Sequence, residues 1–395
     1  MKIIQLNTVT NGCTGRIACG IKEIANKTGH DCIIAYGRGH DNRPDMKRIS
    51  SNSDNYIHAA LTRITDTAGL HSKRATKEFL NFLEEYNPDI IQIHNLHGYY
   101  INYQLLFEYF RTRPNLKIFW TLHDCWPFTG HCPYYTYVGC DKWINGCHHC
   151  QQRLHHPTSY IVDRSKKNYE DKKKAFCGLN NLRIITPSKW MMREVKKSFL
   201  KEYDVEYIPN GIDLSVFHPT DNCFRQKHGI GERILILGVA NLWAKTKGLD
   251  FFIELSNRLS LEQYCIVVVG LSEKQLIKLP KAIIGIKKTE NLDELVDIYS
   301  SADIFLNPTL EDNFPTTNIE SLACGTPVIT FDTGGSPEAL SSKCGLVVNK
   351  NINDIVAACR KMGRKEDIVI KTCLEQASKY DERICYGQYF ELYER

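Results

Sequence analysis

The chain has 395 residues with 43% hydrophobic and 24% charged side chains, which is typical of a soluble globular protein and is enough for two domain cores. No stretch approaches the roughly 20 apolar residues of a membrane span, and the opening MKIIQLN lacks the apolar run of a signal peptide, so we expect a cytoplasmic protein. The net charge of +5 divides unevenly, since residues 1–200 carry 28 Lys and Arg against 17 Asp and Glu, whereas residues 201–395 carry 22 against 28.

Short β-branched runs alternate with helix-period segments along the whole chain, which is the pattern of repeated βα units and a parallel sheet. Strand candidates occur at 2–7, 31–37, 89–95, 117–124 and 182–188 in the first half, and at 233–241, 264–270, 303–308, 327–331 and 345–349 in the second. The pattern predicts an α/β fold with two doubly wound, Rossmann-like domains, joined by the turn-rich stretch 205–222. We expect the domains at 1–212 and 213–375, with a final helix at 376–395 that packs back across the domain junction.

Loops after the predicted strands of the first half carry candidate ligand contacts, because ligands of open α/β sheets lie beyond the carboxyl ends of the strands. Gly12 and Gly15 follow the first strand and would let the backbone approach a phosphate closely. The loop after the strand at 89–95 holds the candidate contacts to an acceptor, which are His94, Asn95 and His97, with Tyr99 and Tyr100 offering faces for stacking on a sugar. A core position is the alternative for the tyrosines.

Sixteen cysteines in a chain without an export signal indicate a reducing compartment, where thiols pack as small hydrophobes or bind metal. Five lie in a cysteine-rich insertion at about residues 125–155, and the last four have seven, six and two residues between them: Cys132, Cys140, Cys147 and Cys150. The closing C-x2-C is half of a common tetrahedral site, so we expect these thiolates to hold a structural zinc. His131, His148 or His149 is an alternative ligand, and reduced thiols without metal are the alternative to zinc.

The stretch EDNFPTTNIESLACGTPVITFDTGGSPE at residues 311–338 places Asp312 and Glu320 eight positions apart, after a predicted strand and at the start of a predicted helix. The helix start, with proline suited to the first helical position, predicts an anion site for a diphosphate formed by Phe314, Pro315, Thr316, Thr317 and Asn318. Glu320 is then placed to accept hydrogen bonds from ribose hydroxyls, and Asp312 from sugar hydroxyls. An ordinary helix with capping acids is the alternative.

The acidic-x7-acidic segment from Asp312 to Glu320, followed by SLACGTPVIT and TGGSPE, resembles the signature of the family 4 glycosyltransferases of the GT-B fold. PSKWMMREVK, VEYIPNGIDLSVFHP and the Lys247-Gly248 pair resemble family motifs in the same order, so the resemblance covers essentially the whole chain. HDCWPFTGHC and the cysteines after it resemble the colanic acid and exopolysaccharide branch. The resemblance implies two domains facing across a cleft, the first binding the acceptor and the second the nucleotide sugar.

The resemblance also implies roles for single residues. His123 matches the histidine that contacts the transferred sugar, and Lys247 matches the lysine that binds the donor diphosphate, so the implied catalytic set is His123, Lys247 and Asp312. The chain departs from the family pattern in carrying Asp312 where members usually have Glu, and Asn241, among the donor-contacting positions, where many have Arg. Lys245 is placed to supply the second positive charge on the diphosphate.

Sugar transfer leaves negative charge on the departing phosphate, which lysines and helix N–H groups stabilise. The sequence has no Asp-x-Asp triplet of the kind that holds a catalytic metal, so we expect metal-independent, retaining transfer of a hexose from a UDP- or GDP-sugar. The expected acceptor is a hydroxyl of a lipid-linked saccharide, in the synthesis of exopolysaccharide, capsule, O-antigen or lipopolysaccharide. The alternatives are a nucleotide-sugar epimerase on the same fold and a zinc-containing nucleic-acid-binding protein; we expect no nucleic-acid partner, because that function leaves the donor motif unexplained.

The lysine-rich run RSKKNYEDKKK at residues 164–174 lies in the domain expected to meet a lipid-linked acceptor. Each basic residue close to an anionic surface contributes on the order of 1 kcal/mol. The run therefore predicts peripheral attachment to the anionic inner face of the plasma membrane, with Lys172, Lys173 and Lys174 in contact with lipid. A solvated helix face is the alternative.

Overall fold

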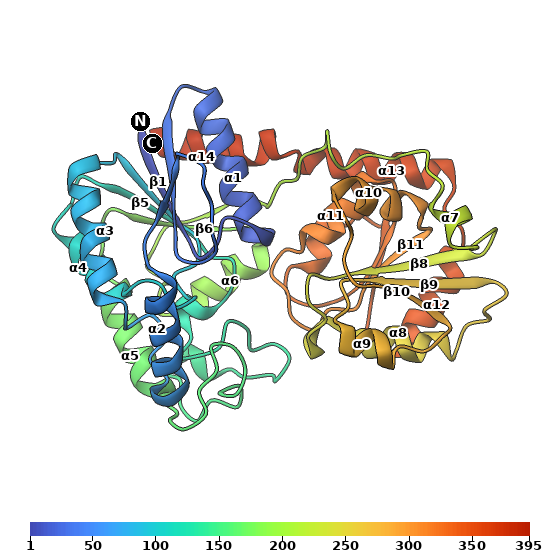
Figure 1. Ribbon diagram of the computed structural model, residues 1–395, viewed down its shortest axis with the longest axis horizontal. Coiled ribbons are helices and arrows are strands. Elements are labelled where there is room, and N and C mark those ends of the chain that lie inside the picture. Colours follow the sequence, from blue (N-terminus) through green and yellow to red (C-terminus); the bar gives the residue numbers. More distant parts are fainter. The chain divides into compact units, whose positions relative to one another are not determined.

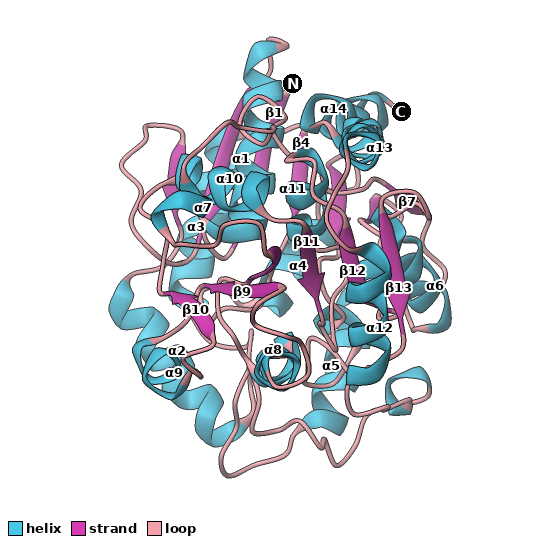
Figure 2. Cartoon of the chain, turned by 90° about the vertical axis from the view of Figure 1, so that its right-hand side faces the viewer, coloured by secondary structure: helices cyan, strands magenta, loops and turns pink.

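The computed structural model describes residues 1–395, which divide into two compact units (Figure 1). Unit 1 comprises residues 1–209 and 386–395, and unit 2 comprises residues 210–385. Each unit is a Rossmann-like α/β domain with its own parallel sheet and helices on both faces (Figures 1 and 2). None of the helices in residues 1–395 combines the length and the apolar character that crossing a bilayer requires.

Seven parallel strands form the sheet of unit 1 in the order β3-β2-β1-β4-β5-β6-β7. Its strands are β1 (Lys2–Asn7), β2 (Asp31–Tyr36), β3 (Met46–Arg48), β4 (Ile90–Ile93), β5 (Lys117–Thr121), β6 (Leu182–Thr186) and β7 (Val205–Tyr207). Its helices are α1 (Gly12–Lys27), α2 (Asn52–Thr65), α3 (Lys73–Tyr86), α4 (Tyr103–Arg111), η1 (Trp126–Phe128), η2 (Lys142–Ile144), α5 (Ser165–Phe176) and α6 (Lys189–Lys197). The strand order reverses between β1 and β4, and a ligand crevice forms at such a reversal.

Six parallel strands form the sheet of unit 2 in the order β10-β9-β8-β11-β12-β13. Its strands are β8 (Ile234–Val239), β9 (Tyr264–Val269), β10 (Ile283–Ile286), β11 (Ile304–Asn307), β12 (Val328–Phe331) and β13 (Gly345–Val348). The helices that begin in it are α7 (Phe224–Lys227), η3 (Lys245–Lys247), α8 (Leu249–Ser256), α9 (Glu273–Lys278), α10 (Leu292–Ser301), α11 (Thr316–Ala323), η4 (Ser336–Ala339), α12 (Ile352–Met362), α13 (Asp367–Ala377), η5 (Ser378–Tyr380) and α14 (Glu382–Glu394). Its strand order reverses between β8 and β11.

The last ten residues of the chain complete unit 1, although the chain enters them from unit 2. Tyr393 O accepts a hydrogen bond from Lys117 Nζ at 2.8 Å, and Tyr393 OH donates to Gln92 Oε1 at 3.0 Å. The rings of Tyr393 and Phe119 lie 4.9 Å apart. These contacts tie the end of α14 to strands β4 and β5.

All ten strands predicted from the sequence are present. The structure adds β3, β7 and β10, each of three or four residues at an edge of its sheet. Strand β7 lies inside the stretch 205–222 that was predicted as a hinge, so the chain leaves the first sheet only after Tyr207.

Candidate functional site

Two residues predicted at the donor site meet at the strand-order reversal of unit 2. Lys247 ends η3 in the loop after β8, and Asp312 lies in the loop after β11. Lys247 Nζ lies 2.6 Å from Asp312 Oδ2, and the backbone N–H of Asn313 donates to Asp312 Oδ1 at 2.9 Å. The two side chains are 36% and 15% exposed, so this pair is within reach of a ligand from solvent. Such a pair can bind a phosphate through the lysine and hydroxyls through the carboxylate.

The close approach of these two loops depends on Gly248. Its φ is +78°, and a Cβ at this position would lie 2.4 Å from Pro308 O. The Leu310 N–H donates to Thr246 O at 2.7 Å and joins the two loops. A side chain at position 248 would therefore push the loops apart and separate Lys247 from its partner.

Glu320, the second acid of the signature, lies on α11 with its side chain buried. Tyr299 OH donates to Glu320 Oε2 at 3.2 Å, and Thr316 Oγ1 donates to Glu320 Oε1 at 3.1 Å. These two hydroxyls fix the orientation of the carboxylate. A carboxylate held in this way is an acceptor for the hydroxyls of a bound ligand.

The start of α11 differs from the prediction. Pro315 precedes the helix and does not occupy its first position, and proline has no N–H with which to bind an anion. The Asn318 N–H donates to Pro315 O at 3.2 Å, and Asn318 Nδ2 donates to Ser336 O at 2.9 Å. Pro315 and Asn318 therefore have structural roles, and an anion at this helix start would be bound by the backbone of Thr316 and Thr317.

Three other predicted donor contacts, Phe314, Asn241 and Lys245, are not part of the ion pair. Phe314 is buried, and its ring centre lies 5.6 Å from that of Tyr380. Asn241 and Lys245 are exposed in the loop after β8. Lys247 is the lysine that contacts Asp312. Lys245 lies two residues before it in the same turn and contributes a charge at the surface.

A chain of three polar side chains in unit 1 includes the predicted His123. Gln5 of β1 is fully buried and donates through Nε2 to Ala18 O at 2.8 Å, which makes its Oε1 the acceptor. His94 Nε2 lies 2.9 Å from Gln5 Oε1, and His94 Nδ1 lies 3.0 Å from His123 Nε2. Burial holds the pKa of His94 well below its usual range and lowers the pKa of His123 to about 4. Both rings are therefore neutral at pH 7.

The hydrogen-bond network assigns the tautomers of these two rings. His94 must donate through Nε2 to Gln5, so its Nδ1 accepts, and His123 must donate through its own Nε2. The Nδ1 of His123 is then an acceptor nitrogen, which suits a sugar hydroxyl better than a phosphate. Gln5 was not predicted, because it lies within the apolar run KIIQLN.

A second histidine pair follows the same two strands. His97 Nε2 lies 2.6 Å from Asp124 Oδ2, and the Trp126 N–H donates to Asp124 Oδ1 at 2.9 Å. Burial raises the pKa of Asp124, but the charge and hydrogen bond of His97 and the Trp126 N–H outweigh it, and the pKa lies below its usual value. The His156 ring centre lies 5.7 Å from that of His97 and 5.8 Å from that of Tyr99. Neither Asp124 nor His156 was predicted, although Asp124 directly follows His123.

Tyr99 and Tyr100 do not present their rings for stacking on a sugar. Both are buried, and Tyr99, with φ +69°, packs in a cluster with Ala59 and Ala68. Tyr100 OH donates to Asn95 O at 2.7 Å, so the Asn95 carbonyl is part of the loop's internal structure. The prediction of stacking faces is therefore wrong, and the alternative of core positions is confirmed.

The two glycines after β1 shape the start of α1. Gly12 opens the helix with φ +69°, and a Cβ at Gly15 would lie 2.5 Å from the carbonyl carbon of Thr10. The loop after β1 thus packs directly against the first turn of α1. The close approach of a phosphate to this loop, at the reversal between β1 and β4, stays a prediction.

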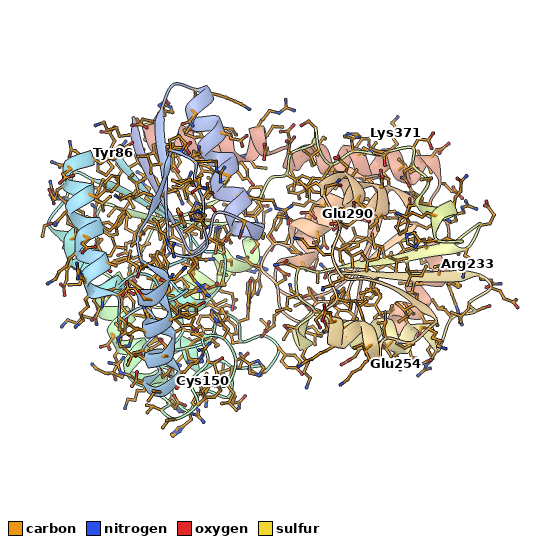
Figure 3. The ribbon with its side chains drawn as sticks, in the orientation of Figure 1. Tyr86, Cys150, Arg233, Glu254, Glu290 and Lys371 are labelled. Atoms are coloured by element: carbon orange, nitrogen blue, oxygen red, sulfur yellow. The ribbon has the colours of Figure 1, made fainter.

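The four cysteines predicted to hold zinc contact one apolar cluster in unit 1, and Cys150 is labelled in Figure 3. Cys132 hydrogen-bonds to Cys150, and Cys147 lies close to both. Residues 1–395 contain no group of three or more His, Cys, Asp or Glu side chains arranged to hold a metal ion. His131, an alternative ligand, has its Nδ1 2.6 Å from Asp66 Oδ1. The four-thiolate site is therefore not assembled in this structure.

Lys172 is buried and does not belong to the exposed part of the lysine-rich run. Its Nζ donates to Trp126 O at 2.7 Å and to Thr129 O at 3.0 Å, and it lies 3.5 Å from the Trp126 ring centre. Burial lowers its pKa to about 7. The prediction that Lys172 contacts lipid is wrong, whereas Lys173 and Lys174 are exposed.

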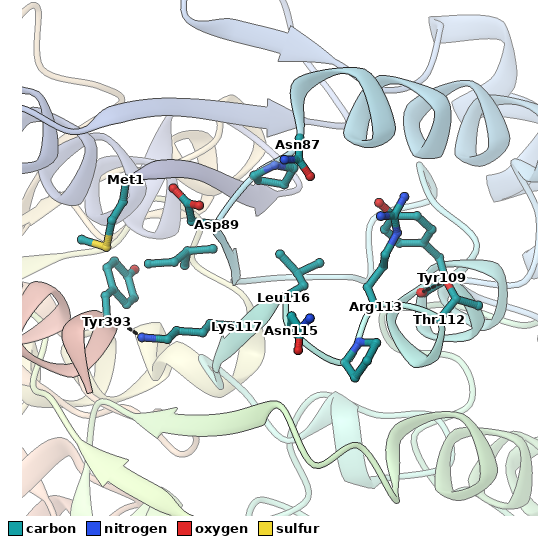
Figure 4. Close-up of a pocket in the computed structure, with 13 residues that line it drawn as sticks. Met1, Asn87, Asp89, Tyr109, Thr112, Arg113, Asn115, Leu116, Lys117 and Tyr393 are labelled. Atoms are coloured by element: carbon teal, nitrogen blue, oxygen red, sulfur yellow. Dashed lines mark hydrogen bonds between the residues drawn. The ribbon is translucent and has the colours of Figure 1, made fainter.

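A cavity of about 720 Å³ lies in unit 1 at the amino ends of β4 and β5 (Figure 4). Its lining includes Asn87, Asp89, Arg113, Lys117 and Tyr393. None of the predicted site residues lines it, and it lies at the end of the sheet opposite to the histidine pairs. The residues that carry chemistry are therefore at the carboxyl ends of the strands and not in this cavity.

Two family models match the chain. The one described as Glycosyltransferase Family 4 matches residues 21–216, and the one described as Glycosyl transferases group 1 matches residues 233–364. The putative colanic acid biosynthesis glycosyl transferase WcaC of Escherichia coli is 26% identical over 54% of this chain and 55% of its own length. The N,N'-diacetylbacillosaminyl-diphospho-undecaprenol alpha-1,3-N-acetylgalactosaminyltransferase of Campylobacter jejuni is 27% identical over 50% of this chain and 56% of its own. The chain thus spans about half the length of these curated relatives.

Solved structures share the fold over the full chain. Sucrose-phosphate synthase from Thermosynechococcus elongatus superposes with a TM-score of 0.74 at 15% identity, covering 100% of this chain and 98% of its own. WaaG, a glycosyltransferase of lipopolysaccharide biosynthesis, has a TM-score of 0.68 at 15% identity and covers 99% of both chains. Anabaena HepE in complex with UDP has a TM-score of 0.65 at 14% identity and covers 100% of both chains.

Proposed function

Because the chain belongs to the family 4 glycosyltransferases of the GT-B fold, we propose that it transfers a sugar from a nucleoside diphosphate donor to a hydroxyl of a saccharide. The observation that carries this proposal is the ion pair between Lys247 and Asp312, 2.6 Å apart in the loops where the strand order of unit 2 reverses. Glu320 follows on the helix that starts from the same loop. Unit 2 thus holds both a positive charge that can bind a diphosphate, on Lys247, and carboxylates that can accept hydrogen bonds from sugar hydroxyls, on Asp312 and Glu320.

On the donor side, Lys247 binds the diphosphate and neutralises the charge that develops as the sugar leaves. The backbone of Thr316 and Thr317 at the start of α11 adds N–H groups to the same task. Glu320 accepts from the ribose, and Asp312 accepts from the sugar while holding Lys247 in position. This arrangement stabilises the leaving group through protein charges, which supports transfer without a catalytic metal.

On the acceptor side, the histidine pairs of unit 1 contact the sugars. The neutral His123, held by His94 and Gln5, contacts a hydroxyl of the transferred sugar. His97, held by Asp124, binds the hydroxyl of the acceptor that attacks the anomeric carbon. Transfer with retention is implied by the family.

The substrates follow from the relatives. HepE was solved with UDP and with UDP-glucose, which supports a UDP-hexose donor, with a GDP-sugar as the other candidate. The Campylobacter jejuni relative has a diphospho-undecaprenol saccharide in its name, and the Escherichia coli relative has colanic acid. These support a lipid-linked saccharide as acceptor and surface polysaccharide as product, made at the inner face of the plasma membrane.

The test is donor binding by calorimetry against a panel of UDP- and GDP-sugars, followed by transfer to a diphospho-polyprenol saccharide in the presence of EDTA. We expect one nucleotide sugar to bind and the anomeric configuration to be retained in the product. Release of a new epimer without any acceptor would establish the epimerase instead. If no nucleotide sugar binds, the proposed donor is wrong. If EDTA abolishes activity and a divalent ion restores it, the proposed metal-independent transfer is wrong.

A structural zinc in the insertion after β5 is a separate part of this proposal. Its support is that Cys132, Cys140, Cys147 and Cys150 contact the same apolar cluster, and that the first and last of these hydrogen-bond to each other. Zinc would draw the four thiolates together and fasten a long loop, without taking part in transfer. Elemental analysis of protein purified under reducing conditions should find one zinc per chain, and the Cys150→Ser variant should lose it. Metal-free wild-type protein with full activity would reject zinc.

A further inference from the structure

Helix α2 presents an apolar face to solvent. Ile57, Leu61 and Ile64 recur at i, i+4 and i+7, so they lie on one side of the helix, and Tyr56 adjoins them. The exposed fractions are 74% for Tyr56, 60% for Ile57, 37% for Leu61 and 49% for Ile64. The opposite side of α2 is the one that packs into unit 1, through His58, Ala59 and Thr62. The exposed apolar face is therefore not needed to hold the helix in place.

The segment Tyr160–Val162 extends this apolar face. The Tyr160 N–H donates to Arg63 O at 2.7 Å, and the Val162 N–H donates to Ile64 O at 3.3 Å, so the segment runs along the end of α2. Its side chains are exposed by 63% for Tyr160, 69% for Ile161 and 40% for Val162. Seven large apolar or aromatic side chains thus form one continuous surface, which is more than scattered exposed residues account for.

Basic residues border this surface. Asp66, which ends α2, accepts a hydrogen bond from the Arg164 N–H at 2.9 Å, and its carbonyl accepts one from Asn168 Nδ2 at 2.6 Å. These bonds hold the start of α5 against the end of α2. Five basic residues are exposed here, namely Arg63, Lys166, Lys167, Lys173 and Lys174, against two exposed acidic residues, Asp163 and Glu170. The border is therefore net positive.

The surface adjoins the residues assigned to the acceptor. Tyr99 packs beneath α2 with Ala59, and its ring centre lies 5.8 Å from that of His156, which in turn lies 5.7 Å from that of His97. The backbone then runs from His156 to the exposed Tyr160 within four residues. The apolar surface and the acceptor residues thus belong to one continuous part of unit 1.

We propose that the outward face of α2 and the segment 160–162 form a membrane-docking surface, whose apolar side chains enter the interface of an anionic bilayer while Arg63 and the α5 lysines meet its headgroups. Tyrosines at the edge of an apolar patch suit the headgroup level, and basic residues beside it suit anionic lipid. This inference rests on the proposed function only for the lipid-linked nature of the acceptor. The apolar surface, and not the lysine run, is then the main membrane contact, because salt does not screen the insertion of apolar side chains into the bilayer.

The experiment is flotation of the full chain with vesicles of phosphatidylglycerol and phosphatidylethanolamine, and with vesicles of phosphatidylcholine, at low and high salt. The triple variant Ile57→Gln, Ile64→Gln, Ile161→Gln should bind anionic vesicles roughly tenfold more weakly or worse at both salt concentrations. The variant Lys173→Glu, Lys174→Glu should bind more weakly at low salt and resemble wild type at high salt. A matched control, Leu261→Gln, Ile277→Gln, Ile368→Gln, changes three exposed apolar residues of unit 2 and should bind as wild type.

Circular dichroism and thermal unfolding should show that the triple variant folds as wild type does. Its transfer to a water-soluble acceptor with a short lipid should be unchanged, since none of the three residues lies in the proposed site. Wild-type vesicle binding by the triple variant would overturn the docking surface and leave the proposed function intact. In another outcome, the wild-type protein fails to bind vesicles and sediments as a dimer that the triple variant does not form. That result would show that the surface binds a second copy of the chain, and it would overturn the membrane-docking proposal. Vesicle binding without any transfer would refute the function and not the surface.

Discussion

Lys247 and Asp312 are 65 residues apart in the sequence, yet the Lys247 Nζ and Asp312 Oδ2 atoms lie 2.6 Å apart. The reversal of strand order between β8 and β11 makes their loops neighbours, and Gly248 lets the loops touch. The ion pair orders the lysine before any ligand arrives. A diphosphate therefore meets a cation that is already in place, which lowers the cost of organising the site.

Lys247→Ala should lower the transfer rate by roughly 100-fold to 1,000-fold, because the charge of the lysine matters most as the phosphate departs. Donor affinity should fall far less than the rate. Turnover numbers with saturating donor and calorimetry with the nucleotide sugar measure the two effects separately. Lys245→Ala is the matched control, since Lys245 is exposed in the same turn and does not contact Asp312; equal losses in both variants would contradict the role of the ion pair.

Asp312→Asn keeps an acceptor oxygen but removes the charge that holds Lys247. We expect roughly tenfold slower turnover, because the lysine samples other rotamers and the sugar loses a charged acceptor. The effect should be smaller when Lys247 is already alanine, and the double-mutant cycle measures that coupling. Fully additive effects of the two substitutions would show that the pair does not act as a unit.

Glu320→Gln should weaken donor affinity by roughly tenfold to 100-fold, the equivalent of losing a charged hydrogen bond of about 1.5–3 kcal/mol to a ribose hydroxyl. Turnover at saturating donor should change less than affinity. Calorimetry with the nucleoside diphosphate alone is enough to measure the loss. Tyr299→Phe removes one hydroxyl that donates to the same carboxylate but keeps its charge, so it should bind the nucleotide within a few-fold of wild type.

Gln5→Met should lower turnover roughly tenfold without changing donor affinity, because His94 loses the acceptor that fixes its tautomer and that of His123. The buried His94 N–H left without a partner should also cost about 1–3 kcal/mol of stability. Gln92→Met is the control, since Gln92 is an equally buried glutamine on β4 that bonds to Thr121 and Tyr393 instead. It should lose stability and keep its turnover. A rate loss in both variants would assign the effect to packing.

Stability should fall as the pH drops from about 6.5 toward 4. Burial lowers the pKa of His58 to about 3 and the pKa values of His123 and His156 to about 4. Since these values lie below those of the unfolded chain, the unfolded state binds more protons in this window, and acidification favours unfolding. Each such histidine contributes a slope of about 1.4 kcal/mol per pH unit within its window.

Urea unfolding at several pH values, followed by fluorescence, measures this slope, and four of the five tryptophans report on unit 1. His58→Gln should reduce the slope, because His58 is fully buried and its ring nitrogens bond to Ser72 Oγ and the Gly69 N–H. His40→Gln, at an exposed position, should leave the slope as it is. An unchanged slope in His58→Gln would show that this histidine is not neutral in the folded chain.

Periodicity predicted the two sheets well, because buried parallel strands are continuous apolar runs bounded by turns. It missed β3, β7 and β10, which have three or four residues and lie at sheet edges, where few side chains are buried. Lys247 and Asp312 were predicted from a motif, and their contact then follows from strand order. Gln5 and Lys172 were not recoverable from sequence, because one lies within an apolar strand and the other within a run of lysines, and only tertiary packing gives each its partners.

Unit 1 is assembled from two separated stretches, and the second of them, residues 386–395, is translated only after the whole of unit 2. During synthesis, all seven strands of its sheet and the whole of unit 2 leave the ribosome before Tyr389 and Tyr393 can cover strands β4 and β5. At about 5–20 residues per second, this leaves the face of the sheet around Phe119 uncovered for roughly 10–40 seconds. The nascent chain therefore carries an open apolar face on this sheet until the final helix arrives.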